Sequence, residues 1–262
     1  MSIHYYCYFK HSFVHSFDSL TQTPCMTQNK FLKPLSLIKD LGHLIYPSSC
    51  LACENELATN ENHICSICDN DLVRTSFHLF NEPSETDKRF WGRIQLKRTY
   101  SHFYYKKGAA IQQVLFNLKY KNDSAIGEHF GREIGKSIRS IHDFKTADAI
   151  IPIPLHYKKE FIRGYNQSEA LAKGLSDIIS VPVKSNYTKR TKHSETQTKK
   201  SRFQRWDNVS SIFAIHKSIK NFKHIIIIDD VVTTGSTMEA LIRSIQDVAP
   251  KIEVSVVTLA IA

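Results

Sequence analysis

Two adjacent carboxylates, Asp229 and Asp230, directly follow four isoleucines and precede a short loop of hydroxyl residues and glycine. The isoleucines predict a buried strand, and residues 236–248 after the loop carry apolar side chains at helical spacing. A loop at a helix N-terminus directs free backbone N–H groups and the positive end of the helix dipole to one point, which suits a phosphate. The predicted phosphate-binding residues are Thr233, Thr234, Gly235, Ser236 and Thr237.

The position of the two carboxylates indicates what else the loop's ligand carries. Asp229 and Asp230 lie next to the predicted phosphate site, where they can accept hydrogen bonds from a diol. A phosphate and a diol held side by side describe a ribose 5-phosphate, so Asp229 and Asp230 are the candidate catalytic residues. The loop lacks the Gly-Lys-Ser/Thr ending of a nucleotide-binding P-loop, which disfavours ATP hydrolysis.

Four cysteines form a second chemical pattern. Cys50 and Cys53 make one Cys-x-x-Cys pair, and Cys65 and Cys68 make another after 11 intervening residues. Two such pairs supply the four thiolates that tetrahedral zinc prefers, so we predict a structural Zn²⁺ site with no open coordination position. Free or disulfide-bonded cysteines are the alternative, and the nearby His63 could compete as a ligand.

The elements that must position these residues can be read from hydrophobic periodicity. Strands are expected within 93–105 and at 149–151, 212–215, 224–229 and 252–261, with a weaker candidate at 181–184 that contains Pro182. Helices are expected at 108–121, 125–141, 166–179 and 236–248. Alternating strands and helices predict an α/β domain with a mainly parallel sheet, whose ligands bind at the carboxyl ends of the strands.

The expected organisation has four parts. Residues 1–29 form a doubtful or disordered N-terminal arm, 30–80 the four-cysteine zinc module, 81–92 a polar linker and 93–262 the α/β domain. Residues 1–25 contain six aromatic side chains and have the features of neither a secretory signal nor a mitochondrial transit peptide. We expect them to be a disordered arm or an upstream translation artefact, with Met26 as the true start.

Several motifs resemble the ComF family, which is linked to DNA uptake in competent bacteria. The stretch around Asp229 resembles the phosphoribosyl-pyrophosphate (PRPP) signature of type I phosphoribosyltransferases. In the order seen in the ComF family, the chain carries the cysteine pairs, Leu118-Lys119-Tyr120-Lys121, Ile151-Pro-Ile-Pro-Leu-His156, Arg163-Gly-Tyr-Asn166-Gln167, Gln197-Thr198, Arg205 and Asn208-Val209. The match covers residues 45–262 and implies a type I phosphoribosyltransferase-like sheet flanked by helices, preceded by a small zinc-ribbon-like module.

The resemblance also implies a reaction and roles for residues. PRPP with Mg²⁺ would bind, Asp229 and Asp230 would contact the ribose hydroxyls, and the phosphoribosyl group would pass to a nitrogen acceptor that the sequence does not identify. Such chemistry would serve DNA uptake, natural transformation or nucleotide metabolism. The loop from Pro152 to His156 would lie near the pyrophosphate. The residues implied there are Pro152, Pro154, His156, Lys158, Lys159 and Arg163.

The net charge of +10 is concentrated in one segment. Residues 184–205 carry eight basic residues against one acid, Glu195. The resemblance implies that this segment is a mobile loop that covers the pyrophosphate. The alternative is a solvated loop with no role in ligand binding. The candidate basic-loop residues are Arg190, Lys199, Arg202 and Arg205.

A different class of function stays open beside the enzyme. Phe203 and Trp206 lie next to arginines, and basic surfaces with aromatic side chains suit single-stranded DNA, although the two rings could equally be core residues. The alternative is a catalytically silent protein that senses PRPP or a nucleotide, binds single-stranded DNA and works with DNA-uptake proteins. No apolar run approaches the 18 or so residues of a membrane span, and we expect a cytoplasmic protein.

Overall fold

The computed structural model describes residues 48–77, 79, 82–191 and 212–262. These residues belong to one compact unit that spans Tyr46–Ala262. The expected arm at 1–29, with its start at Met26, lies outside the described residues. Within the part of the chain that the structure describes, no helix is long and apolar enough to cross a membrane.

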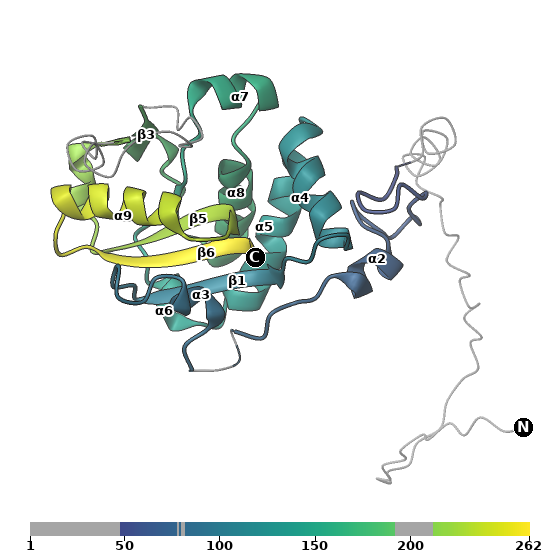
Figure 1. Cartoon of the computed structure of the whole chain (residues 1–262), viewed down its shortest axis with the longest axis horizontal. Coiled ribbons are helices and arrows are strands. Elements are labelled where there is room, and N and C mark those ends of the chain that lie inside the picture. Colours follow the sequence, from purple (N-terminus) through teal and green to yellow (C-terminus); the bar gives the residue numbers. More distant parts are fainter. Residues whose placement is uncertain (1–47, 78, 80–81, 192–211) are drawn as a thin grey trace, which may run out of the picture. The chain divides into compact units, whose positions relative to one another are not determined.

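A sheet of four parallel strands forms the centre of the unit, in the order β1-β6-β5-β2. The strands are β1 (Arg98–Tyr104), β2 (Ala149–Pro152), β5 (His224–Val232) and β6 (Glu253–Ile261). β5 pairs on both edges: Ile227 lies opposite Ile151 of β2 and Val256 of β6. Figure 1 shows β5 and β6 crossing the middle of the molecule. The apolar, β-branched sequence of these strands is typical of parallel strands buried on both faces.

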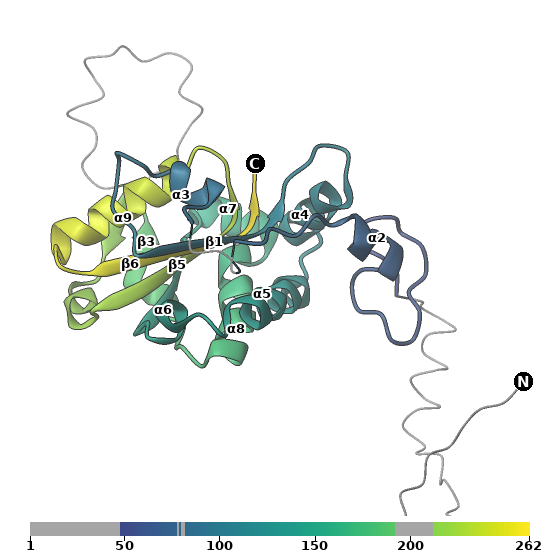
Figure 2. The same ribbon diagram turned by 90° about the horizontal axis from the view of Figure 1, so that it is seen from below.

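Helices cover both faces of the sheet (Figure 2). On one face lie α5 (Ser124–Ile138), α6 (His142–Lys145) and α8 (Gln167–Ile179), and on the other lies α9 (Ser236–Val248). Ile226 and Ile228 of β5 enter the core on the first face, whereas Ile225 and Ile227 enter the core on the α9 face. Each buried isoleucine contributes about 1.5–3 kcal/mol, so β5 anchors both layers.

Glycines allow α5 and α8 to pack closely. A Cβ atom on Gly127 would lie 2.5 Å from the Cβ of Ala170, and one on Gly131 would collide with the Leu171 carbonyl oxygen. These glycines are four residues apart and therefore lie on the same face of α5. The close packing holds α8 on α5, and Ser168 at the start of α8 contacts Asp229 of β5.

Further elements surround the carboxyl end of the sheet. α4 (Ala110–Tyr120) follows β1, and α7 (Tyr157–Arg163) follows β2. The short strands β3 (Thr188–Arg190) and β4 (Phe213–Ile215) form a separate antiparallel pair. Two 3₁₀ helices, η1 (Ser185–Tyr187) and η3 (Lys217–Asn221), flank this pair in the chain.

The cysteine-bearing segment packs against α4. It contains α2 (Ser66–Asp71) and two isolated bridges, Ser49 with Glu56 and Asn62 with Ile64. The Asn117 side chain of α4 donates a hydrogen bond of 2.8 Å to the Leu51 carbonyl oxygen. Leu51 also joins the core that contains Leu118 of α4. A contiguous apolar core therefore joins this segment to the α/β domain.

Two segments differ from the pattern expected from the sequence. Residues 181–184 form no strand; Val183 makes an isolated parallel bridge to Ile150, in keeping with Pro182, which cannot donate a backbone hydrogen bond. The stretch predicted as a linker contains α3 (Glu85–Lys88), whose Ser84 forms a capping box, and Phe90, which is 1% exposed. The four-part division of the chain itself stays a prediction.

Candidate functional site

The acidic pair lies inside β5, because the strand continues beyond Asp230 to Val232. Two other elements supply partners for it. Ser168, at the start of α8, donates a hydrogen bond of 2.7 Å from its hydroxyl to Asp229 Oδ1. Lys119 of α4 makes an ion pair of 2.9 Å with Asp230 Oδ2. Residues from three elements that are far apart in the sequence therefore meet at the carboxylates.

The environment of the pair favours a proton on Asp229. Burial, followed by the neighbouring charge of Asp230, raises the pKa of Asp229 to about 7. The hydrogen bond from Ser168, the backbone N–H of Asp230 and the charge of Lys119 oppose this rise. Near neutral pH the pair can hold one proton, and a cation or a hydrogen-bond donor in the site would favour the doubly ionised form.

The predicted phosphate loop connects β5 to α9. Gly235 is the N-cap residue of α9 with φ +75°, a left-handed conformation that glycine adopts without strain. The hydroxyls of Thr234 and Ser236 lie 2.9 Å apart, and both side chains are exposed, as are those of Thr233 and Thr237. The first N–H groups of a helix have no partner within the helix. The loop thus combines hydroxyls, N–H groups and a helix dipole, as the sequence pattern predicts.

Arg93, which was not among the predicted site residues, connects this loop to α9. Its guanidinium donates to the Thr234 carbonyl oxygen at 2.8 Å and pairs with Glu239 of α9 at 2.9 Å. A Cβ atom on Gly235 would lie 2.8 Å from the Phe90 ring. Phe90 lies in the stretch predicted as a linker, 81–92, and Arg93 is the first residue after it, so this stretch also contributes to the shape of the loop.

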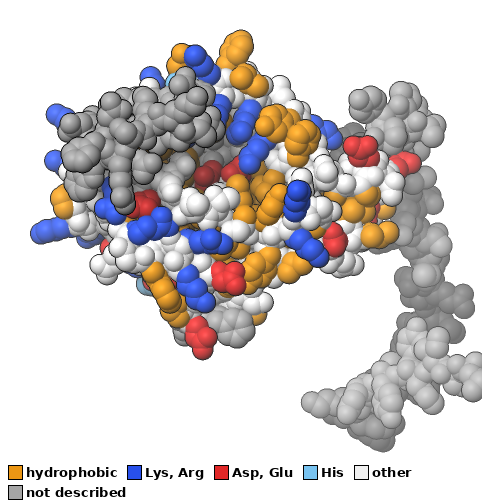
Figure 3. All heavy atoms as spheres, in the orientation of Figure 1, with side chains coloured by type: hydrophobic (Ala, Val, Ile, Leu, Met, Phe, Trp, Pro, Cys, Tyr) orange, Lys and Arg blue, Asp and Glu red, His pale blue; other side chains and the backbone are white. Residues whose placement is uncertain are grey.

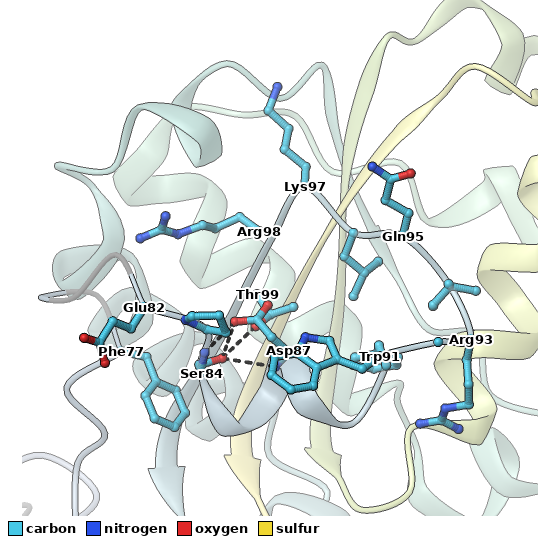
Figure 4. A pocket seen from close by; sticks show the side chains of 15 residues that line it. Phe77, Glu82, Ser84, Asp87, Trp91, Arg93, Gln95, Lys97, Arg98 and Thr99 are labelled. Atoms are coloured by element: carbon cyan, nitrogen blue, oxygen red, sulfur yellow. Dashed lines mark hydrogen bonds between the residues drawn. The ribbon is translucent and has the colours of Figure 1, made fainter.

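Arg93 also lines a hollow of about 650 Å³ around residues 82–99. Figure 4 shows the hydrogen-bonded cluster of Ser84, Asp87 and Thr99 in its wall, with Lys97 and Arg98 extending from the adjoining segment. Neither carboxylate of the acidic pair lines this hollow. It is therefore separate from the acidic pair, although Phe90 and Arg93 of its lining also lie against the phosphate loop.

The residues predicted for the pyrophosphate lie at the end of β2 and on α7. Pro152 ends β2 and Pro154 is buried in the turn that follows. His156 is 6% exposed, and its ring nitrogen accepts a hydrogen bond from the Lys158 backbone N–H at the start of α7. His156 therefore caps a helix, a role that its sequence position did not reveal.

Basic side chains gather on this side of the site. Burial lowers the pKa of Lys159, and the positive charges of Arg190, Arg163 and Lys119 lower it further. Arg163 donates to Gln167 at 2.7 Å and lies 5.8 Å from the centre of the Tyr120 ring. Mutual repulsion of neighbouring cations is relieved by an anion, so the arrangement favours a multiply charged ligand.

Arg190 of β3 links this basic group to the acidic pair. Burial lowers the pKa of Arg190, and the charge of Asp229 opposes the shift. Arg190 also lies over the Phe213 ring of β4, 5.6 Å from its centre. The other predicted basic-loop residues, Lys199, Arg202 and Arg205, lie outside the described residues, as do Phe203 and Trp206. Figure 3 shows acidic side chains in a recess with basic and apolar side chains around its rim.

The four cysteines come together as their spacing predicts. Their sulfur atoms all lie within 4.8 Å of one another, and those of Cys53 and Cys65 are 3.8 Å apart. A tetrahedral ion with zinc–sulfur bonds of about 2.3 Å needs sulfurs about 3.8 Å apart, so this set fits a metal ion such as zinc. His63 is not part of the group; its ring packs against His129 at 5.1 Å.

Backbone donors favour the thiolate form of one cysteine of this cluster, Cys50, whereas burial raises the pKa of Cys68. Burial alone would raise the pKa of the Cys50 thiol, but backbone N–H groups of Cys65, Cys53 and Ala52 outweigh it and lower the pKa to about 7. The N–H of Cys65 lies 3.3 Å from Cys50 Sγ. Thiolate is the form that binds metal, so the knuckle geometry suits ligation.

Known proteins resemble this chain over much of its length. A family described as phosphoribosyl transferase domain matches residues 165–261. Competence protein F of Haemophilus influenzae is 28% identical over 76% of this chain and 84% of its own length. Competence protein ComFC of Bacillus subtilis is 26% identical over 80% and 82%, and DNA utilization protein YhgH of Escherichia coli K12 is 26% identical over 74% and 89%. These similarities support the ComF family, which the sequence motifs resemble.

The likeness to the ComF family agrees with the architecture. The predicted fold class is confirmed: a type I phosphoribosyltransferase-like parallel sheet lies between helices, after a small four-cysteine module of zinc-ribbon type. The family match from 165 to 261 includes α8, β5, the phosphate loop and α9. The individual roles of the site residues stay predictions.

Three further residues complete the candidate site, and the sequence assigned a role to none of them: Lys119, Ser168 and Arg93. Lys119 lies in a motif that carried the family resemblance, but no local signal pairs it with Asp230 across 111 residues. Ser168 follows the helix cap Asn166, a position that usually indicates helix initiation rather than ligand binding. Long-range packing alone brings these side chains to the site.

Proposed function

We propose that this chain binds PRPP at the carboxyl end of β5 and transfers its phosphoribosyl group to a nitrogen acceptor. The observation that carries the proposal is the juxtaposition of the Asp229–Asp230 pair with the hydroxyl loop on one side and the basic group of α7 and β3 on the other. These three surfaces match the diol, the 5-phosphate and the pyrophosphate of one molecule.

Each part of the ligand has a counterpart in the site. The loop from Thr233 to Thr237 holds the 5-phosphate with N–H and hydroxyl groups. The acidic pair accepts hydrogen bonds from the ribose hydroxyls. The basic side chains, Lys158, Lys159, Arg163 and Arg190, face the pyrophosphate. Mg²⁺ prefers carboxylate and phosphate oxygens, so Asp229 and Asp230 are suited to an ion carried by the pyrophosphate, which would neutralise charge on the leaving group.

The reaction is a displacement at the ribose C1′ carbon. The bond from C1′ to the pyrophosphate oxygen breaks, and its electron pair leaves with pyrophosphate. The lone pair of the acceptor nitrogen forms the new bond, and the nitrogen loses a proton to water. Positive charge develops on the ribose as the leaving group departs, and the carboxylates of Asp229 and Asp230 stabilise it.

Isothermal titration with PRPP and Mg²⁺, together with pyrophosphate release, tests this function. The double variant Asp229→Asn/Asp230→Asn should lose PRPP binding by at least tenfold. Asp177→Asn is the matched control, because Asp177 is an exposed carboxylate that pairs with Arg132 at the surface of α8. Unchanged PRPP binding by the double variant, or absence of binding by the wild-type chain, contradicts the proposal.

We also propose that the four-cysteine group holds one Zn²⁺ with a structural role. The sulfur positions support tetrahedral ligation, and four protein ligands leave no coordination position for a substrate. The cluster packs on α4, which carries Lys119 of the candidate site. Loss of the ion is therefore expected to loosen the support of α4.

A second candidate function is binding of single-stranded DNA. The observation that favours it is the outer surface of α7, where Phe161 and Ile162 are 89% and 75% exposed beside the basic Lys158 and Lys159. Aromatic side chains stack with bases, and lysines contact phosphates. The names of the relatives associate them with competence and DNA utilization. The expected cytoplasmic location stays a prediction.

Fluorescence anisotropy with a labelled oligothymidylate at increasing salt tests this candidate. Binding should weaken steeply with salt and fall severalfold in Phe161→Ala. Ile67→Ala, which removes an exposed apolar side chain of α2, is the control. DNA binding without pyrophosphate release would favour the silent binding protein over the enzyme, and equal binding by Phe161→Ala and wild type would exclude α7 as the contact.

A further inference from the structure

The cysteine-bearing segment holds α4 at two points. In the turn of the first cysteine pair, the Leu51 carbonyl oxygen accepts a hydrogen bond of 2.8 Å from the Asn117 side chain. After the second pair, Asp71 at the end of α2 accepts a hydrogen bond of 3.2 Å from the Ala110 backbone N–H. Ala110 begins α4 and Asn117 lies in its last turn, about 10 Å further along the helix axis. Both ends of α4 are therefore tied to the segment.

The contact at the start of α4 supplies a missing helix cap. The N-cap residue of α4 is Ala109, which has no polar side chain, so Asp71 provides the acceptor from another element. Apolar packing adds to the polar contacts, because Leu51 and Leu72 share a core with Leu118 of α4. The orientation of α4 therefore depends on where both cysteine pairs lie.

A metal ion would fix the two cysteine pairs relative to each other. The sulfur atoms of Cys53 and Cys65, one from each pair, lie 3.8 Å apart. An ion bound by all four thiolates is a cross-link between the turn that contains Leu51 and the helix that ends at Asp71. The ion would thereby set the distance between the two supports of α4.

The opposite face of α4 reaches the candidate site. Lys119 follows Asn117 by two residues, which turns its side chain by about 200° around the helix axis. There its ammonium group pairs with Asp230 Oδ2 at 2.9 Å. In the turn between α7 and α8, the Tyr165 hydroxyl donates a hydrogen bond to the Leu118 carbonyl oxygen. α4 is thus the link between the cysteine pairs and the acidic pair.

We propose that Asn117 and Asp71 are positioning residues, through which the four-cysteine group holds Lys119 beside Asp230 and couples metal binding to PRPP binding. This inference rests on the proposed function and names a regulation of the same site. A helix held in place by the metal keeps the ammonium group against the carboxylate that would accept a ribose hydroxyl. Coupling between two sites is reciprocal, so PRPP tightens metal binding by the factor by which metal tightens PRPP binding.

Chelator competition measures this factor in the full chain. The Kd for Zn²⁺ is determined with and without PRPP in excess Mg²⁺, which does not compete for thiolates, with the chelator calibrated in the same buffers. In wild type, PRPP should lower the Kd for Zn²⁺ about tenfold. Asn117→Asp keeps the shape but loses the donor, Asp71→Ala loses the acceptor, and each should reduce the factor to below about threefold. Asp71→Asn keeps an acceptor oxygen and should restore the factor.

Gln113→Ala is the matched control and should keep the wild-type factor, because this amide is exposed on the same helix one turn before Asn117. A double-mutant cycle separates positioning from general loosening of the fold. In the metal-loaded chain, Lys119→Met and Asn117→Asp should each raise the Kd for PRPP about fivefold, and the double variant should raise it no further. Additive losses overturn the inference. So do a lack of zinc binding, and a factor near one in wild type when PRPP binds.

The proposed function can fail separately from this inference. If the metal-loaded wild-type chain does not bind PRPP, the function fails, and urea unfolding of that chain decides whether the positioning exists. The cycle of Lys119→Met with Asp230→Asn measures the coupling within this ion pair. The coupling should shrink at least about twofold when Asn117→Asp is added, and an unchanged coupling refutes the inference.

Discussion

Replacement of Lys119 by methionine should destabilise the protein in a pH-dependent way. Lys119 and Asp230 are 2.9 Å apart, with side chains 24% and 12% exposed. At an effective dielectric constant of about 20, the Coulomb attraction at that distance is about 6 kcal/mol, and desolvation of both charges offsets much of it. Since the pair is partly open to water, we expect a net loss of about 1–3 kcal/mol of unfolding free energy at pH 8.

The pH dependence follows from Asp229. Its folded pKa of about 7 lies above the ordinary value of 3.8, so the folded state binds more protons than the unfolded state between these values. The unfolding free energy therefore falls as pH rises from about 4 to 7. Lys119 lowers the pKa of Asp229, and its removal should extend this fall to higher pH. Lys119→Met should thus cost more stability at pH 8 than at pH 5.

Urea unfolding of wild type and variants at pH 5 and pH 8 measures this effect. Lys136→Met is the matched control, because Lys136 is 58% exposed and pairs with Glu133 on the surface of α5. It should cost less than about 0.5 kcal/mol at both pH values. A double-mutant cycle with Asp230→Asn isolates the ion pair. Equal losses for Lys119→Met and Lys136→Met, or a loss independent of pH, would refute the reasoning.

The remaining predictions concern the phosphate loop, the helix contact and the metal. Gly235→Ala places a Cβ atom at φ +75° and 2.8 Å from the Phe90 ring. Urea unfolding should therefore show a loss of about 1–3 kcal/mol of unfolding free energy, and PRPP binding should weaken. Gly92→Ala, at a similar φ but in open space, should cost less, and equal losses would argue against the clash. Gly131→Ala should lower the unfolding free energy by about 1–3 kcal/mol, because the added methyl group pushes α5 away from α8. A loss below about 0.5 kcal/mol would contradict the close packing. Metal analysis should find about one zinc per chain, and Cys65→Ser should lower both zinc content and thermal stability; full occupancy in that variant would exclude Cys65 as a ligand.

Local patterns predicted the elements that have strong periodicity. The helix expected at 236–248 matches α9, and that expected at 166–179 matches α8 to within one residue. Both have clear apolar faces and an identifiable start. By contrast, α7 was not predicted, because its apolar residues Phe161 and Ile162 face solvent and give no amphipathic pattern. The strand expected at 181–184 is reduced to a single bridge, since Pro182 lacks a donor.

The sequence by itself determined the chemistry of two short windows. The cysteine pairs and the run of isoleucines, aspartates and hydroxyl residues each place their groups within a few residues, so local geometry brings them together. Only the tertiary structure decided which distant side chains complete the site. Lys119 reaches Asp230 because α4 follows β1, an edge strand of the same parallel sheet in which β5 is an inner strand. Ser168 reaches Asp229 because α8 packs on α5 through glycine contacts. Such pairings depend on strand order and helix packing, which no short stretch of sequence encodes.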